Sequence, residues 1–186
     1  MLTLTFSKFK IHITFGFLFL VAISSSNSDN ISLYCLLFCL LHEASHLLAM
    51  SLFGIKISQI KFYGGGIKIV SDPLLSLSKL KSAIIYFAGC FCNLLLALFL
   101  AKIKPDLAFV NIFLGLFNLL PISYFDGGKL LQNFCVLSET TLQKISKTTF
   151  CIVAISAVFA VFYFKIPLGA SAVFTLLFVS FSEYLE

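Results

Sequence analysis

Long apolar stretches, separated by short polar segments, limit the folds available to this chain more than any other feature of its sequence. Of its 186 residues, 60% are hydrophobic and 11% are charged, whereas about a quarter of the residues in a typical soluble domain are charged. A soluble core of this size does not bury so much apolar surface. We therefore expect lipid, rather than water, to surround most of the chain.

Six of the apolar stretches have the character of membrane-spanning helices, which predicts an all-α polytopic membrane protein with a single domain, residues 1–186. The six predicted helices are residues 11–23, 31–53, 82–101, 107–120, 148–164 and 167–181. The first follows two lysines, as the core of a signal peptide would, but residues 24–28 make a poor cleavage region and we expect an uncleaved helix. Pro121 is expected to end the fourth helix.

The lysines predict the orientation of these helices. Lysine supplies all thirteen basic residues, and lysine-containing segments follow the second and fourth helices. Short loops with excess lysine stay in the cytoplasm. This places both termini there and the protein in a bacterial inner or cell membrane, although Lys102, Lys104 and Lys165 fall on the opposite side. No basic run is present, so no nucleic-acid partner is expected.

The polar segment after the second helix predicts a small β-hairpin at the membrane face. Residues 55–62 alternate apolar and polar side chains, residues 63–66 are a glycine-rich turn, and residues 67–70 match a returning strand. An isolated hairpin is marginally stable, so we expect it to pack on the helices. Its edge offers a place for an extended substrate segment; an ordinary connecting hairpin is the alternative.

The pentapeptide His42-Glu43-Ala44-Ser45-His46 lies in the middle of the second predicted helix. Residues four apart share one face of a helix, so both imidazoles can bind one metal ion, and Glu43 can act as the general base on its water. Charged side chains deep in a bilayer cost about 2.5–3.5 kcal/mol and mark functional sites. The alternative is a polar trio that hydrogen-bonds other helices.

A catalytic zinc site normally has three protein ligands, and Asp126 is the candidate for the third. Pro121 interrupts the chain shortly before it, and irregular backbone at membrane depth is tolerated where it lines a cavity. Gly127 and Gly128 are expected to turn the chain tightly after the carboxylate. The remaining acidic residues outside the pentapeptide lie in loops or near the C-terminus: Asp29, Asp72, Asp106, Glu139, Glu183 and Glu186.

These motifs together resemble the site-2 protease family of intramembrane zinc metalloproteases, over a core of residues 31–131. The motifs that carry the resemblance are His42-Glu43-x-x-His46, Asn118-x-x-Pro121 and Asp126-Gly127. The sequence is most similar to the small bacterial branch that includes the sporulation stage IV protease, which processes a sigma-factor precursor. The resemblance implies that His42, His46 and Asp126 hold Zn²⁺ and that Glu43 activates water.

The third predicted helix carries a further part of the resemblance. Family members have an Ala-Gly-Pro-x-x-Asn pattern, and here Ala88-Gly89-Cys90-Phe91-Cys92-Asn93 matches it with Cys90 in place of proline. Asn93 is implied to donate a hydrogen bond on the oxyanion side of the catalytic site. Neither a PDZ nor a CBS domain is found, so we expect the membrane domain, the hairpin or a partner to select the substrate.

The predicted function is therefore regulated proteolysis of a membrane-associated protein, such as a sigma-factor precursor or an anti-sigma factor. The expected partners are that substrate, the lipid bilayer and an inhibitory or adaptor membrane protein. A membrane transporter or metal-binding scaffold that uses the intramembrane histidines and aspartate is the alternative, as is an inactive family member that serves as a scaffold.

The cysteines are expected to be free thiols that pack as small hydrophobic side chains. Two of them, Cys35 and Cys39, share one helical stripe with His42 and His46. Cys39 lies one turn before His42 and is expected to line the cavity wall rather than bind zinc.

Overall fold

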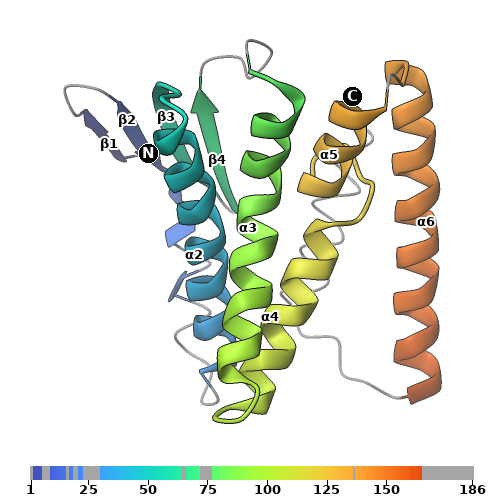
Figure 1. Cartoon of the computed structure of the whole chain (residues 1–186). Coiled ribbons are helices and arrows are strands. Elements are labelled where there is room, and N and C mark those ends of the chain that lie inside the picture. Colours follow the sequence, from blue (N-terminus) through green and yellow to red (C-terminus); the bar gives the residue numbers. More distant parts are fainter. Residues whose placement is uncertain are drawn as a thin grey trace. The chain divides into compact units, whose positions relative to one another are not determined.

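The computed structural model describes residues 2–5, 9–15, 17–18, 21–22, 30–63, 66–71, 77–135 and 137–164 (Figure 1). The chain divides into two compact units, Met1–Leu119 and Leu120–Glu186. In the described part of the chain, the elements with defined bounds are a four-stranded sheet and three helices in the first unit and two helices in the second. The predicted helix at residues 167–181 lies outside the described residues.

Three helices form the body of the first unit: α2 (Ile31–Leu52), α3 (Lys79–Leu100) and α4 (Pro105–Asn118). Helix α3 packs against both α2 and α4 (Figure 1). Their bounds agree closely with the predicted helices at 31–53, 82–101 and 107–120. Helix α3 begins where Ser78 accepts a hydrogen bond from the Lys81 backbone N–H at 3.5 Å, and Pro105 opens α4, where proline is tolerated.

Helices α2 and α3 have 22 residues each, so each is about 33 Å long and long enough to cross the ~30 Å hydrocarbon core of a bilayer. Among the described residues, these are the two helices that are both long and apolar enough to span a membrane. Helix α4 is apolar but has 14 residues. The prediction of six spans is therefore not confirmed.

The sheet has the order β1-β2-β3-β4, with strands at Leu2–Thr5, Lys10–Ile13, Ile57–Tyr63 and Gly66–Ser71. Strands β3 and β4 are antiparallel and confirm the predicted hairpin, while β2 joins β3 in parallel. The prediction that the first helix begins at Ile11 is wrong. Lys10-Ile11-His12-Ile13 alternates polar and apolar residues, a strand pattern, and the fold contains this sheet as well as helices.

The small core of the first unit lies where α2 and α3 meet the sheet. Ala49, Met50 and Ile85 are buried at its centre. Partly buried side chains from the helix ends and from both strands of the hairpin surround them: Phe53, Ile55, Ile57, Ile69, Leu77 and Ala88. The hairpin therefore packs on the helices, as an isolated hairpin would need to do.

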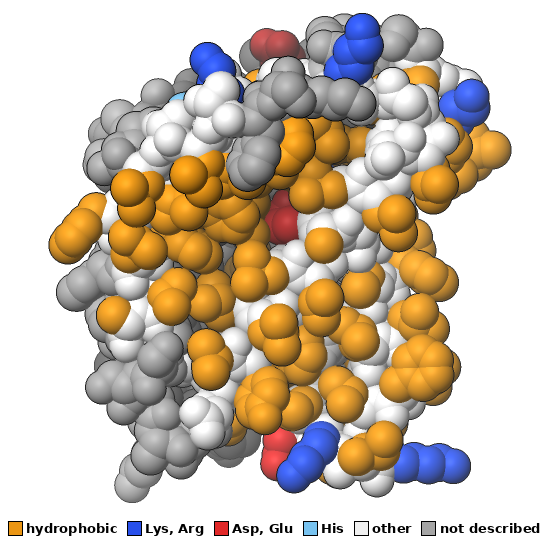
Figure 2. All heavy atoms as spheres, turned by 90° about the vertical axis from the view of Figure 1, so that its left-hand side faces the viewer, with side chains coloured by type: hydrophobic (Ala, Val, Ile, Leu, Met, Phe, Trp, Pro, Cys, Tyr) orange, Lys and Arg blue, Asp and Glu red, His pale blue; other side chains and the backbone are white. Residues whose placement is uncertain are grey.

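The helices of the first unit expose apolar side chains and bury polar ones, the reverse of a soluble fold. On α3 the exposed apolar residues follow a helical spacing, and on α2 and α4 large apolar side chains are exposed as well. His42, His46 and Asn93 are buried. Apolar side chains cover the middle of the face shown in Figure 2, and lysines gather at its upper and lower edges. This distribution suits a chain whose helices face lipid.

The second unit contains α5 (Asp126–Phe134) and α6 (Glu139–Phe164). Helix α6 begins nine residues before the predicted start at Thr148, because Ser138 accepts a hydrogen bond from the Thr141 backbone N–H at 3.2 Å and caps a polar first turn. The Ser146 hydroxyl accepts a hydrogen bond from the Ser123 backbone N–H at 3.1 Å. This bond ties α6 to the segment that leads into α5.

Candidate metal centre

Helix α2 brings His42 and His46 together on its buried face. Their side chains lie one turn apart, with the two Nε2 atoms 3.2 Å from each other and the ring centroids 4.8 Å apart. Two nitrogens bound to one tetrahedral ion at about 2.0–2.1 Å are separated by about 3.3 Å. The observed separation of the Nε2 atoms therefore fits two ligands of one zinc-like ion.

The far side of the His46 ring is fixed by α3. Nδ1 of His46 lies 2.7 Å from the backbone carbonyl oxygen of Ile85. A carbonyl oxygen only accepts hydrogen bonds, so Nδ1 must carry the proton and donate it. In a neutral imidazole this leaves the lone pair on Nε2, which is the atom that faces His42. Metal-binding histidines are commonly oriented by such a bond.

Asn93 of α3 contacts the other histidine. Its Nδ2 atom lies 3.3 Å from Nδ1 of His42, and the asparagine is almost completely buried. Among the residues that the structure describes, Oδ1 of Asn93 is a buried atom without a hydrogen-bond partner. A buried polar atom in that condition costs free energy. Asn93 is therefore beside the histidine pair, as the sequence predicts, with one polar atom still available to a ligand.

Gly89 gives the two imidazoles the space they occupy. A Cβ atom at this position would lie 2.5 Å from Nε2 of His42 and 2.5 Å from Nε2 of His46. The sequence reveals Gly89 only as part of a pattern on α3, and Ile85 is not signalled at all. Both roles depend on the alignment of α2 with α3, which no local sequence pattern specifies.

Glu43 follows His42 on α2, about 100° further around the helix, and its side chain is half-buried. Glu43 is therefore next to the histidine pair but projects from a neighbouring face of α2 and not from the face that carries both imidazoles. This is the position that the pentapeptide predicts for a residue that reaches toward the metal centre without being one of its ligands.

Asp126 belongs to the second unit and is the first residue of α5. Its side chain is 7% exposed, and Lys129 places Nζ 3.5 Å from Oδ1. A carboxylate in the first turn also interacts favourably with the positive end of the helix dipole. Contrary to the sequence expectation, Gly127 and Gly128 continue the helix instead of making a tight turn. Gly128 is needed because a Cβ there would overlap the Ile122 carbonyl.

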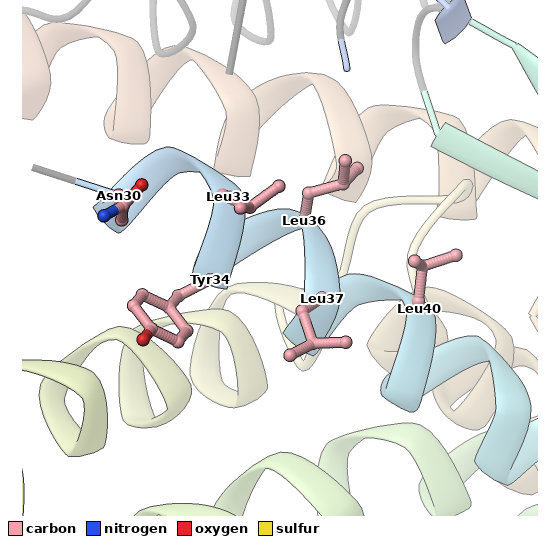
Figure 3. Close-up of a pocket in the computed structure, with 6 residues that line it drawn as sticks. All are labelled: Asn30, Leu33, Tyr34, Leu36, Leu37 and Leu40. Atoms are coloured by element: carbon pink, nitrogen blue, oxygen red, sulfur yellow. The ribbon is translucent and has the colours of Figure 1, made fainter. Parts of the chain in front are cut away.

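A surface hollow of about 500 Å³ lies along the N-terminal half of α2 (Figure 3). Its walls are almost entirely apolar and contain none of the predicted site residues; they are Asn30, Leu33, Tyr34, Leu36, Leu37 and Leu40. The predicted site residues of the first unit lie instead in the packed interface of α2 and α3.

Comparison with known proteins finds one similar structure and one matching sequence family. The structure is similar to that of the site-2 protease from Methanocaldococcus jannaschii, with a TM-score of 0.63 and 19% sequence identity, covering 100% of this chain and 94% of that one. The sequence model of peptidase family M50 matches residues 106–163, which include Asn118, Pro121 and Asp126. Both similarities agree with the resemblance to the site-2 protease family that the sequence motifs carry. No curated protein matches its sequence.

The matched range of the peptidase model covers less than half of the chain. The structural likeness, at 19% identity, concerns the fold. The matched sequence range contains the Asp126 segment, whereas α2 with its histidine pair lies outside it. The family model therefore covers the segment that contains Asp126, whereas the histidine pair is described by the geometry of α2 and α3 alone.

Proposed function

We propose that this chain is a member of the site-2 protease family, a zinc endopeptidase that cuts membrane-associated proteins, with His42, His46 and Asp126 as the zinc ligands and Glu43 as the general base. The observation that carries this proposal is the buried imidazole pair of α2, whose Nε2 atoms converge at 3.2 Å inside an apolar helix. Two nitrogen ligands and one carboxylate ligand form a donor set typical of catalytic zinc.

The protein residues divide the work of peptide hydrolysis between them. When bound, zinc lowers the pKa of a water ligand to about 7 and polarises the scissile carbonyl group. Glu43 accepts the proton of the attacking water and later delivers it to the leaving amine. The half-buried position of Glu43 suits a base that must meet water within an otherwise apolar helix.

Asn93 is proposed to serve both the histidine and the substrate. A half-turn of its amide lets Oδ1 accept the hydrogen bond from Nδ1–H of His42, which leaves the lone pair of Nε2 for the metal. Nδ2 then occupies the place of the unpartnered Oδ1 and can donate to the carbonyl oxygen of a bound substrate as negative charge develops there.

Two variants separate these roles of Asn93. We expect Asn93→Ala to lower both zinc affinity and kcat by about 10–100-fold, because it removes the partner of His42. Asn93→Asp still accepts the hydrogen bond from His42 but has no N–H donor, so zinc affinity should be retained while kcat falls by about 100-fold or more. Zinc competition with a chromogenic chelator and single-turnover cleavage measure the two effects. Equal kcat values for Asn93→Asp and wild type would show that Asn93 does not donate a hydrogen bond to the substrate carbonyl oxygen in the transition state.

Gly89→Ala tests the fit between α2 and α3. Alanine favours the helix over glycine by about 1 kcal/mol, so the substitution would stabilise α3 if there were free space beside position 89. Because its Cβ would lie 2.5 Å from both Nε2 atoms, we expect zinc affinity to fall by at least about tenfold. Gly115→Ala on α4 is the matched control, since its nearest contacts would be at 3.4 Å. Equal zinc affinity in both variants would contradict the close packing of Gly89 against the two imidazoles.

Asp126→Asn tests the third ligand. An amide oxygen binds zinc far more weakly than a carboxylate, so we expect zinc affinity to fall by more than about 100-fold, beyond the range of a residue that only orients a ligand. Asp106→Asn is the control, because Asp106 is exposed in the first turn of α4. X-ray absorption of the wild-type protein should show nitrogen and oxygen neighbours that include two imidazole rings, which are recognised by their outer-shell scattering. Full zinc affinity in Asp126→Asn would exclude Asp126 from the ligand set.

The substrate is proposed to be a membrane-embedded segment that unwinds before it is cut, since the backbone of an intact helix shields its own peptide bonds. The resemblance to the sporulation branch favours a sigma-factor precursor, and an anti-sigma factor has the same chemistry. The lysine distribution favours a bacterial inner or cell membrane with both termini cytoplasmic. The regulator is proposed to be an inhibitory or adaptor membrane protein. Co-expression with each candidate substrate in membranes, followed by sequencing of the new termini, tests these finer assignments.

A further inference from the structure

Two cysteines of α2 lie on the same stripe as the histidine pair, and the proposed hydrolysis uses neither. Cys35 and Cys39 are half-buried free thiols that lie four residues apart, about one turn, on the helix. At 100° per residue, the four side chains of Cys35, Cys39, His42 and His46 fall within an arc of about 60°. The dithiol therefore continues the line of the metal centre toward the N-terminal end of α2.

The geometry of this pair favours a bridging ion over a disulfide. Side chains four residues apart on a helix have Cβ atoms about 5–6 Å apart, whereas a disulfide requires about 3.5–4.5 Å. An ion between the two sulfurs spans the wider separation without distorting the helix. Thiolates are soft ligands that select thiophilic cations with filled d shells.

Electrostatics favour a divalent ion. Binding replaces two S–H bonds by two metal–sulfur bonds and releases two protons to water: M²⁺ + 2 RSH → M(SR)₂ + 2 H⁺. The product carries no net charge, which suits a half-buried position in an apolar helix where an unpaired charge is costly. Glu43 lies four residues after Cys39 on the same helix, so a bound ion would lie one turn from the general base.

We propose that Cys35 and Cys39 form a second metal site for a divalent thiophilic cation, such as zinc in excess of the catalytic ion or Cd²⁺, and that its occupation inhibits proteolysis. The inhibitory part rests on the proposed function, whereas the binding part does not. The dithiol binds more weakly than the centre of His42, His46 and Asp126, because α2 supplies it with two ligands, so it fills second.

Phenylarsine oxide is a probe for the dithiol that does not bind imidazole or carboxylate. It reacts as C₆H₅As=O + 2 RSH → C₆H₅As(SR)₂ + H₂O, so a stable adduct requires two neighbouring thiols. With the full chain in detergent, we expect intact-mass spectrometry to show one adduct in the wild type and in the control Cys151→Ser, a change at an exposed cysteine of α6. Neither Cys35→Ser nor Cys39→Ser should form it. An unchanged adduct in both variants would overturn the site.

Metal counting then tests the inhibition. Wild type should bind a second equivalent of zinc and lose at least about tenfold in cleavage rate as it does so. Cys35→Ser and Cys39→Ser should bind one equivalent and remain active in excess zinc. A second equivalent with full inhibition in both variants would contradict the proposal. Failure of the proposed function gives a different result. If His42, His46 and Asp126 do not hold zinc, His46→Ala keeps its first equivalent of zinc, whether or not phenylarsine oxide forms an adduct with the dithiol.

Discussion

Glu43→Gln is expected to lower kcat for peptide cleavage by about 10²–10⁴-fold, the usual contribution of a general base, while the protein keeps its bound zinc. Glutamine has nearly the same size as glutamate, so the packing of α2 should change little. It cannot accept the proton of the attacking water. Because Glu43 is not one of the proposed ligands, metal content should stay at the wild-type value when it is measured by elemental analysis.

Glu139→Gln is the matched control for this substitution. Glu139 is an exposed residue in the first turn of α6, so its variant should cleave at the wild-type rate. Both proteins should be compared after purification in the same detergent, with a membrane-embedded substrate present in excess. Undiminished cleavage by Glu43→Gln with zinc bound would show that another residue is the base, or that a contaminating protease produced the activity.

His46→Ala is expected to lower zinc affinity by more than about 100-fold, beyond the 10–100-fold range of residues that only orient a ligand. The substitution removes one of the two Nε2 atoms that converge at 3.2 Å. It also leaves the Ile85 carbonyl without the hydrogen bond from Nδ1 at 2.7 Å. Cleavage should fall in parallel with zinc content.

His12→Ala provides the same chemical change at a distance from the metal centre. His12 lies in β2, where Nδ1 is 3.1 Å from the Thr3 hydroxyl, and its loss should leave zinc binding unchanged. Far-ultraviolet circular dichroism of both variants shows whether the helices are retained. Equal zinc affinity in His46→Ala and His12→Ala would mean that the imidazole pair is polar packing between α2 and α3.

Much of the fold follows from apolar length and helix-end chemistry. Helices α2, α3 and α4 are predicted because each is a long apolar run with a clear boundary, such as Pro105 at the start of α4. The strand at Lys10–Ile13 is missed because four alternating residues adjoin a longer apolar run that suggests a helix. Helix α5 is missed because two glycines in its first turn are a turn signal, although Gly128 is required by the Ile122 carbonyl.

The candidate site is predictable to the extent that its residues are neighbours in sequence. The i, i+4 spacing of His42 and His46 predicts their convergence, which the structure confirms. Asn93 is found through the family pattern on α3, which places it at the catalytic site, and the structure shows its contact with His42. The hydrogen bond from His46 to Ile85 and the clearance at Gly89 depend on how α2 and α3 are aligned. That alignment results from packing over the whole helix pair, which one sequence does not reveal.

The central claim, that one zinc ion per chain performs proteolysis, is tested most directly by titrating metal back into the stripped protein. The full chain is depleted with a chelator, Zn²⁺ is added in steps, and the rate of cleavage of a membrane-embedded substrate is measured against bound zinc per chain. We expect no cleavage without metal, a linear rise of the rate with bound zinc, and a maximum at one zinc per chain. Cleavage that persists after complete removal of metal, or no cleavage at one zinc per chain, would contradict the claim.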